Sequence, residues 1–183
     1  MTLNTDDQIL ALVRSADTKE RGFRLLVATY QEPLYTLIRR MVRTHEDADD
    51  VLQECLIKVY RGIGRFEGKS KLYTWLYRIA TNEALTFLKK RQRRAEDALD
   101  DEGHAGVYQL RAETPIDAND LQRKLERALT QLPDKQRLVF NLRYFEEMSY
   151  KEMGVLLQTS VGALKASYHH AVKKVEAALQ AEM

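Results

Sequence analysis

The sequence has few of the residues that break or cross-link a chain. Among its 183 residues are one cysteine, three prolines and eight glycines. The single cysteine, Cys55, excludes an intrachain disulfide and a zinc site built from several cysteines. The scarcity of proline and glycine leaves long stretches rich in Leu, Ala, Glu, Lys and Arg, which favour helix. We therefore predict an all-α protein with a buried thiol at Cys55.

Long apolar runs are also absent. No segment approaches the ~18 uninterrupted apolar residues of a membrane helix, and residues 1–7 are polar and acidic, unlike a secretory signal. We expect a soluble, cytoplasmic protein without membrane contact of its own. At 44% apolar residues, the chain can still bury one core or two small ones.

The net charge of +2 hides blocks of charge along the chain. Residues 61–95 carry ten Lys and Arg against two Asp and Glu, whereas residues 96–120 carry one against eight. Residues 121–183 carry ten against seven. Nucleic-acid phosphates would bind the basic block and avoid the acidic one. Plain solvation of charged faces is the alternative reading of all three blocks.

The acidic block has the composition of a linker. It contains Gly103, Gly106 and Pro115, lacks a sustained helical period and repels itself. Its alternative role is an acidic mask that folds back on the basic helix. We expect two small helical domains, 1–95 and 121–183, joined by an acidic flexible linker over 96–120.

Apolar side chains spaced by three and four residues predict the helices of the first domain. One helix runs from about Phe23 to Met41, and Pro33 should kink it or split it at Glu32. Thr44 then offers a cap for the next helix. The expected buried stripe of that next helix is Ala48, Val51, Leu52, Cys55, Leu56, Val59 and Tyr60.

The opposite face of this capped helix is acidic and carries an amide. It presents Asp49, Asp50, Gln53, Glu54 and Lys58. Such a face suits Arg or Lys side chains of a partner helix, and solvation is again the alternative.

A loop with three glycines, RGIGRFEGKSK at residues 61–71, separates this helix from one predicted over about 72–91. The outward face of the second of these helices carries Tyr73, Thr74, Arg78, Asn82, Leu85 and Lys89. Aromatic rings stack on unpaired bases, Asn pairs with base edges, and cations hold phosphates. The face is therefore a candidate reader of unstacked bases, although Tyr and Trp near a helix start more often belong to the core.

The second domain has the pattern of a helix-turn-helix. Ser149 with Glu152 forms a capping box before a two-turn helix, residues 150–157, and Ser160 caps the next helix after a short turn. The second helix is expected to bury Leu164, Tyr168, Ala171 and Val175. It leaves outward Ala163, Lys165, Ala166, Ser167, His169, His170, Lys173 and Lys174. Small residues at its start would let it enter a major groove. An ordinary helical hairpin is the alternative.

Two stretches of the chain resemble the sigma factors of bacterial RNA polymerase. DADDVLQECLIKVYRGIGRF followed by SKLYTWLYRIATNEAL is similar to region two of the extracytoplasmic-function (ECF) group of the sigma-70 superfamily. LPDKQRLVFNLRYFEEMSYKEMGVLLQTSVGALK resembles their region four. The combination of both stretches in this order is highly specific for this family. The resemblance implies a non-enzymatic subunit, without cofactor, that binds core RNA polymerase and directs it to promoters.

The resemblance also assigns residues to three contacts. Those matched to core polymerase, at the clamp helices of its largest subunit, are Asp49, Asp50, Gln53, Glu54 and Lys58. Those matched to the minus-ten element, including the loop that holds a flipped base, are Phe66, Lys69, Ser70, Lys71, Tyr73, Trp75, Arg78, Asn82 and Lys89. Those matched to the minus-thirty-five duplex are Ser160, Ala163, Lys165, Ser167, His169, His170, Lys173 and Lys174. An anti-sigma factor is a further partner that the family suggests.

The predicted recognition helix is poor in arginine. Family members commonly have arginines where this chain has Ser167, His170 and Val172, so we expect weak duplex contacts in which lysines hold phosphates. The adjacent His169 and His170 point about 100° apart on a helix, with no Cys or third His near, which argues against a metal site.

Two other classes of protein are alternatives to a sigma factor. A stand-alone helix-turn-helix regulator would not require the acidic helix, the loop and the aromatic basic helix in succession. A nuclease acting at Asp49, Asp50 and Glu54 would need these carboxylates in a pocket with a metal, and the pattern places them on an exposed helix face.

Overall fold

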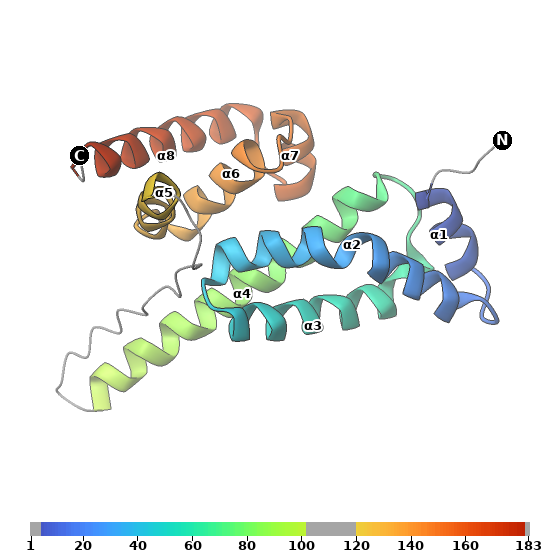
Figure 1. Cartoon of the computed structure of the whole chain (residues 1–183). Coiled ribbons are helices and arrows are strands. Elements are labelled where there is room, and N and C mark those ends of the chain that lie inside the picture. The colour runs from blue at the N-terminus through green and yellow to red at the C-terminus, as the bar shows by residue number, and fades with distance from the viewer. Residues whose placement is uncertain (1–4, 102–119, 182–183) are drawn as a thin grey trace. The chain divides into compact units, whose positions relative to one another are not determined.

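The computed structural model describes residues 5–101 and 120–181, and every regular element in them is helical (Figure 1). The elements are α1 (Thr5–Val13), α2 (Lys19–Val42), α3 (His45–Gly62), a 3-10 turn η1 (Ile63–Arg65), α4 (Leu72–Asp101), α5 (Asp120–Thr130), α6 (Asp134–Tyr144), α7 (Tyr150–Leu157) and α8 (Val161–Ala181). The all-α prediction is confirmed. Most of the predicted linker lies outside the described residues. Among the described helices, none is both long enough and apolar enough to cross a membrane.

The chain divides into two compact units, with the boundary inside α4 after Ala84. In the first unit, α2 packs against α1 and against α3. Its core consists of apolar side chains that recur every three or four residues, as the sequence predicts. Fully buried examples are Leu26, Leu34 and Ile38 of α2 and Ala48, Cys55 and Val59 of α3.

Helices α1 and α2 approach each other closely at Gly22. A Cβ atom built there would lie 2.7 Å from Leu12 Cβ and 2.8 Å from Val13 Cγ1. Both distances are shorter than carbon atoms tolerate, so a side chain at Gly22 would push α1 away from α2. Tyr30 adds a polar contact between the same helices by donating a 2.5 Å hydrogen bond to Asp6 Oδ1. Burial and this contact with the carboxylate raise the pKa of Tyr30.

Replacing Gly22 by Ala should therefore destabilise the first unit. We expect the overpacking to cost about 1–3 kcal/mol of unfolding free energy, seen as a lower midpoint of thermal unfolding by circular dichroism. Gly64→Ala is the matched control, because a Cβ there meets no atom within 4 Å. Equal midpoints for the two variants would show that α1 does not pack as described.

Pro33 does not split α2, contrary to one of the two outcomes expected from the sequence. The helix continues from Lys19 to Val42 with Pro33 inside it. Pro33 is exposed, while Leu34, Leu37 and Ile38 beside it are buried. Packing of these residues, and of the buried Leu26 before the proline, thus offsets the one backbone hydrogen bond that Pro33 removes.

Helix α4 is longer than the sequence pattern indicates. We predicted an end near Arg91 and a structureless linker from Glu96, but the helix continues to Asp101. The residues that follow Arg91 include Ala95, Glu96 and Ala98, which are good helix formers. Gln92 Nε2 also donates to Glu96 Oε1 at 2.8 Å, one turn along the helix. Local propensity thus extends the helix beyond the last residues of the apolar stripe.

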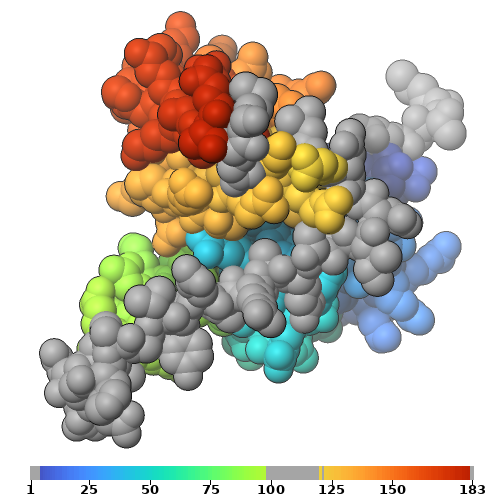
Figure 2. Space-filling model, turned by 60° about the vertical axis from the view of Figure 1, so that its left-hand side comes forward, coloured from blue at the N-terminus to red at the C-terminus, as the bar shows by residue number. Residues whose placement is uncertain are grey.

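The second unit contains the end of α4, from Leu85, and α5 to α8. Helix α8 lies along α5 and α6 (Figures 1 and 2) and also contacts α7. Its core is a cluster of buried side chains: Ala128, Leu129, Leu132, Phe140, Ala171 and Val175. Tyr168 stacks on Phe140 with ring centroids 5.8 Å apart. Helices α7 and α8 with the turn between them confirm the predicted helix-turn-helix.

Candidate functional site

The polar face predicted on α3 is exposed to solvent. Thr44 caps the helix by accepting a hydrogen bond from the Asp47 amide at 3.1 Å, as predicted. The side chains assigned to this face are all exposed: Asp49, Asp50, Gln53, Glu54 and Lys58. Lys58 differs from the others because its Nζ forms a 2.6 Å ion pair with Glu83 of α4. It therefore joins α3 to α4 in addition to any external contact.

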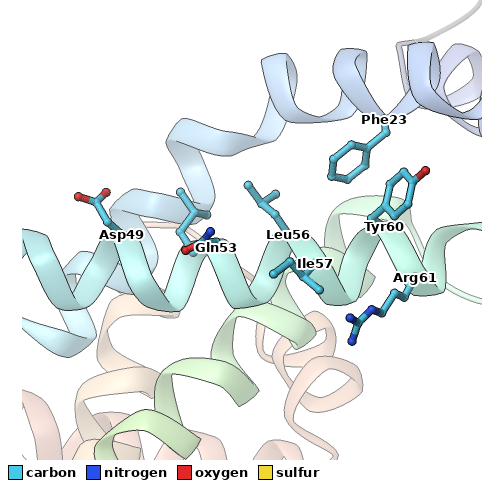
Figure 3. A pocket seen from close by; sticks show the side chains of 8 residues that line it. Phe23, Asp49, Gln53, Leu56, Ile57, Tyr60 and Arg61 are labelled. Atoms are coloured by element: carbon cyan, nitrogen blue, oxygen red, sulfur yellow. The ribbon is translucent and has the colours of Figure 1, made fainter.

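An apolar hollow of about 490 Å³ lies beside these polar residues, between α2 and α3 (Figure 3). Its lining residues are Phe23, Asp49, Leu52, Gln53, Leu56, Ile57, Tyr60 and Arg61. Asp49 lies at one end of the hollow and Arg61 at the other. Arg61 follows Asp49 by twelve positions, which corresponds to about 18 Å along α3.

The prediction of the buried stripe of α3 is wrong at two residues that line the hollow. Tyr60 was expected in the core but is 41% exposed, and Leu56 is only half-buried. The Tyr60 ring is held by Phe23, with ring centroids 4.9 Å apart, and by Lys19, whose Nζ lies 4.3 Å from the ring centroid. Stacking with these neighbours keeps the ring at the surface of α2 and α3 instead of beneath them.

The apolar part of the hollow was missed by the sequence analysis, although one signal was available. Ile57 follows the polar residues Gln53 and Glu54 and is 36% exposed. An apolar side chain at the edge of a solvated helix face has no role in the core of its own domain. Ile57 and Tyr60 together therefore mark a surface suited to a partner.

Cys55 lies on the buried side of α3, as predicted, with no exposed surface. Burial, followed by the negative charge of Glu83, raises the pKa of the Cys55 thiol to about 12, and the nearby Lys58 offsets part of this effect. The thiol stays neutral at physiological pH and serves as a small apolar side chain.

The loop between η1 and α4 carries an aromatic pair at its base. The ring of Phe66 lies 5.5 Å from that of Trp75, and both side chains are half-buried. Trp75 in turn packs over Gly62, where a Cβ would lie 3.2 Å from the Trp ring. Gly68 has a φ of +73°, a conformation that favours glycine. The remaining predicted loop residues are exposed or half-exposed: Lys69, Ser70 and Lys71.

Helix α4 brings some of the predicted minus-ten residues onto one face and leaves others apart. Asn82 and Lys89 are exposed and Arg78 is half-buried on the same face. Tyr73 lies about 180° from Asn82 around the helix, with its ring 4.2 Å from that of the buried Tyr77. Thr74, expected outward, is 5% exposed. Tyr73 and Thr74 therefore do not share the outward face of Asn82, contrary to the prediction, and lie on the side of α4 that packs in the first unit.

The helix-turn-helix presents most of the predicted outward residues of α8. Ser149 and Glu152 form the capping box of α7, Gln158 turns the chain at a φ of +52°, and the Ser160 Oγ accepts from the Ala163 amide at 3.2 Å. Leu164, Ala171 and Val175 are buried as expected, and Tyr168 is half-buried. Exposed residues on α8 are Ala163, Lys165, Ala166, His169, His170, Lys173 and Lys174, while Ser167 is half-buried.

Two of the outward lysines contact neighbouring helices. Lys174 Nζ donates to Gln136 Oε1 at 3.0 Å, and Lys165 Nζ lies 5.9 Å from the centre of the Tyr150 ring. The rings of His169 and His170 are 6.0 Å apart and inclined at 56° to each other. The described residues bring together no group of three or more His, Cys, Asp or Glu side chains suited to a metal ion.

Comparison with known proteins matches both units to one family. Residues 26–94 match the model of sigma-70 region 2, and residues 122–175 match that of sigma-70 region 4. The RNA polymerase sigma-H factor of Pseudomonas aeruginosa is 37% identical to the chain, over 98% of this chain and 96% of the relative. The ECF RNA polymerase sigma-E factor of Escherichia coli is 32% identical, over 96% of this chain and 95% of the relative.

Solved structures show the same fold. CnrH, determined in complex with the cytosolic domain of CnrY, has a TM-score of 0.71 at 23% identity, over 98% of this chain and 100% of CnrH. The sigma factor RpoE, co-crystallised with the anti-sigma factor NepR from Bartonella quintana, has a TM-score of 0.72 at 24% identity, over 89% of this chain and 99% of RpoE.

The chain belongs to the sigma-70 family of transcription initiation factors, in its ECF group. It is an alternative sigma factor that directs RNA polymerase to promoter-specific initiation of transcription. Sigma factors bind core RNA polymerase and promoter DNA in the cytoplasm and catalyse no reaction themselves. The stand-alone regulator and the nuclease are thereby set aside.

Proposed function

We propose that the hollow of α3 and its polar rim form the main contact with core RNA polymerase. The observation that carries this assignment is the exposed Ile57 and Tyr60 next to the acidic face of α3. The hollow is about 18 Å long, with Asp49 at one end and Arg61 at the other. It suits an amphipathic helix that carries a basic side chain opposite Asp49 and an acidic side chain opposite Arg61. The apolar centre would supply most of the binding free energy, and the charged rim would set the orientation.

The loop after η1 and the outward face of α4 are proposed to bind the opened minus-ten element. The Phe66–Trp75 pair supplies aromatic surface beside a loop that Gly68 lets turn sharply. Asn82 carries a donor and an acceptor for a base edge, and Arg78 and Lys89 lie on the same face to hold phosphates. Extruding a base costs a few kcal/mol, so stacking and hydrogen bonding must act together.

Helix α8 is proposed to bind the minus-thirty-five element as duplex DNA. Small, exposed residues near its start, such as Ala163, allow close approach to a major groove. Lys165, Lys173 and Lys174 supply phosphate contacts, and His169 and His170 can donate to phosphates or bases. Phosphate contacts outnumber base-reading side chains on this face, so we expect modest sequence discrimination there.

An anti-sigma factor is a further proposed partner. The support is the family itself, because RpoE of Bartonella quintana binds the anti-sigma factor NepR. An inhibitor that covered Ile57 and Tyr60 would exclude the polymerase from the same apolar surface.

A photo-crosslinking amino acid placed at one position at a time tests the three surfaces together. In a promoter complex of the holoenzyme, we expect crosslinks from Gln53 to the largest polymerase subunit, from Asn82 to the minus-ten element and from His169 to the minus-thirty-five duplex. All three positions are exposed, so the substitution should not disturb folding. Thr29, exposed on α2, is the control position. An exchange of partners between any two positions would overturn the corresponding assignments.

A further inference from the structure

An ion pair joins α3 to α4 within the first unit. Lys58 Nζ lies 2.6 Å from Glu83 Oε1, and the unit extends from Met1 to Ala84. The two side chains differ in their surroundings, because that of Lys58 is 52% exposed and that of Glu83 only 14%. A short charge-assisted hydrogen bond to a largely buried carboxylate is stronger and better oriented than an ion pair in open solvent.

Glu83 lies on the side of α4 that packs in the first unit. At 100° per residue, it is about 20° from Leu76 and about 60° from Ala80 around the helix axis, and both of these residues are fully buried. Its carboxylate is also close enough to the buried Cys55 of α3 to raise the pKa of that thiol. A carboxylate in this position needs a cation beside it. Lys58 supplies that cation from α3.

Lys58 faces away from the hollow of α3. It follows Asp49 by nine positions, which places the two residues about 180° apart around the helix axis. Tyr60 lies about 160° from Lys58, and Lys58 does not line the hollow. Helix α3 thus presents the proposed polymerase surface on one side and Lys58, with its contact to α4, on the other.

The position of the Asn82 side chain depends on how α4 is rotated about its own axis. Asn82 directly precedes Glu83, so a contact that holds Glu83 also fixes the direction in which Asn82 extends. Side-chain ends lie about 5–6 Å from a helix axis, so a rotation of about 10° moves them by about 1 Å. A hydrogen bond to a base edge does not tolerate this shift, because its donor–acceptor distance spans only about 2.7–3.2 Å. Apolar packing, such as that of Trp75 over Gly62, is not directional and defines the rotation less sharply.

We propose that the Lys58–Glu83 ion pair fixes the rotation of α4 relative to α3 and so holds Asn82 at a set position relative to a polymerase bound at the hollow. This role rests on the proposed assignments of the hollow to polymerase and of Asn82 to the minus-ten element. Lys58 and Glu83 are positioning residues, which act through Asn82 and touch neither the polymerase nor the DNA. Promoter opening therefore depends on the pair, whereas binding to core polymerase does not.

Replacing Glu83 by Gln tests this role, because the amide keeps the size of the side chain and removes its charge. Open complexes of the reconstituted holoenzyme would be measured on a duplex promoter, well below the unfolding midpoint of each variant, together with affinity for core enzyme. Glu83→Gln should form open complexes about fivefold less readily, since part of the Asn82 contact is lost, and should bind core within about twofold of the wild type. Glu32→Gln removes an exposed carboxylate from α2 and should behave as the wild type in both measurements.

Double variants separate positioning from a general loss of stability. When Asn82 is already replaced by Ala, Glu83→Gln should cause no further loss of opening, because a contact that is absent cannot be misplaced. Losses that multiply in the double variant would overturn the proposal. The reversed pair, Lys58→Glu with Glu83→Lys, should open the promoter more readily than Glu83→Lys alone, and an equal defect in these two would also overturn it.

Asn82→Ala by itself distinguishes the failure of the pair from the failure of the proposed site. If Asn82→Ala opened the promoter normally, the assignment of Asn82 to the minus-ten element would fail, and the positioning role of the pair with it. If Asn82→Ala were impaired and Glu83→Gln were not, only the positioning role of the pair would fail.

Discussion

Replacing Ile57 by Asp should weaken binding of the chain to core RNA polymerase by about 30-fold or more. The side chain lines the apolar hollow together with Phe23, Leu56 and Gln53. A buried, unpaired carboxylate at the centre of an interface costs at least about 2 kcal/mol, as truncation of a central apolar anchor does.

The free chain should stay folded in this variant, because Ile57 already lies at the surface, 36% exposed, before any partner binds. Affinity is measured by titrating labelled chain with core enzyme, and thermal unfolding is compared in parallel. Ile57→Leu keeps the apolar surface and should bind within about threefold of the wild type. Thr29→Asp adds the same charge at an exposed position of α2 and should have no effect. If Ile57→Asp bound core normally, the polymerase contact would have to lie elsewhere than the hollow.

The helical elements could be predicted because their signals are local. The Thr44 cap and the Ser149–Glu152 capping box each involve residues three positions apart, and both are observed. The buried residues Leu164, Ala171 and Val175 follow from periodicity alone. The end of α4 was missed because the apolar stripe fades while helix-forming residues continue. Periodicity reports on burial, whereas propensity decides where an exposed helix stops.

The candidate site could be predicted only in part, because some of its features depend on two helices at once. The polar residues of α3 were found from one helical face. The position of Tyr60 was not, since Phe23 and Lys19 of α2 hold its ring at the surface. In α4, Tyr73 was grouped with Asn82 by residue type, but its ring packs against Tyr77 on the opposite side. Side-chain chemistry suggests a role, and only the tertiary packing decides which side chains can act together.

Replacing Asn82 by Ala should impair promoter opening while leaving binding to core polymerase intact. Asn82 is exposed on α4 and does not line the hollow of α3, and alanine is the better helix former, so the fold should not suffer. Loss of a hydrogen-bonded contact to a base edge costs about 1–3 kcal/mol. We therefore expect open complexes to form about tenfold less readily, measured by the reactivity of unpaired thymines near the start site.

A template mismatched over the minus-ten element separates opening from later steps. The few kcal/mol needed to unpair and unstack a base are already supplied in such a template, so transcription by the Asn82→Ala holoenzyme should recover most of the wild-type level. Gln31→Ala, which removes an exposed amide from α2, should behave as wild type on both templates. Equal loss of core binding and opening would contradict the assignment of Asn82 to DNA. An undiminished defect on the mismatched template would instead place its contribution after the strands have separated.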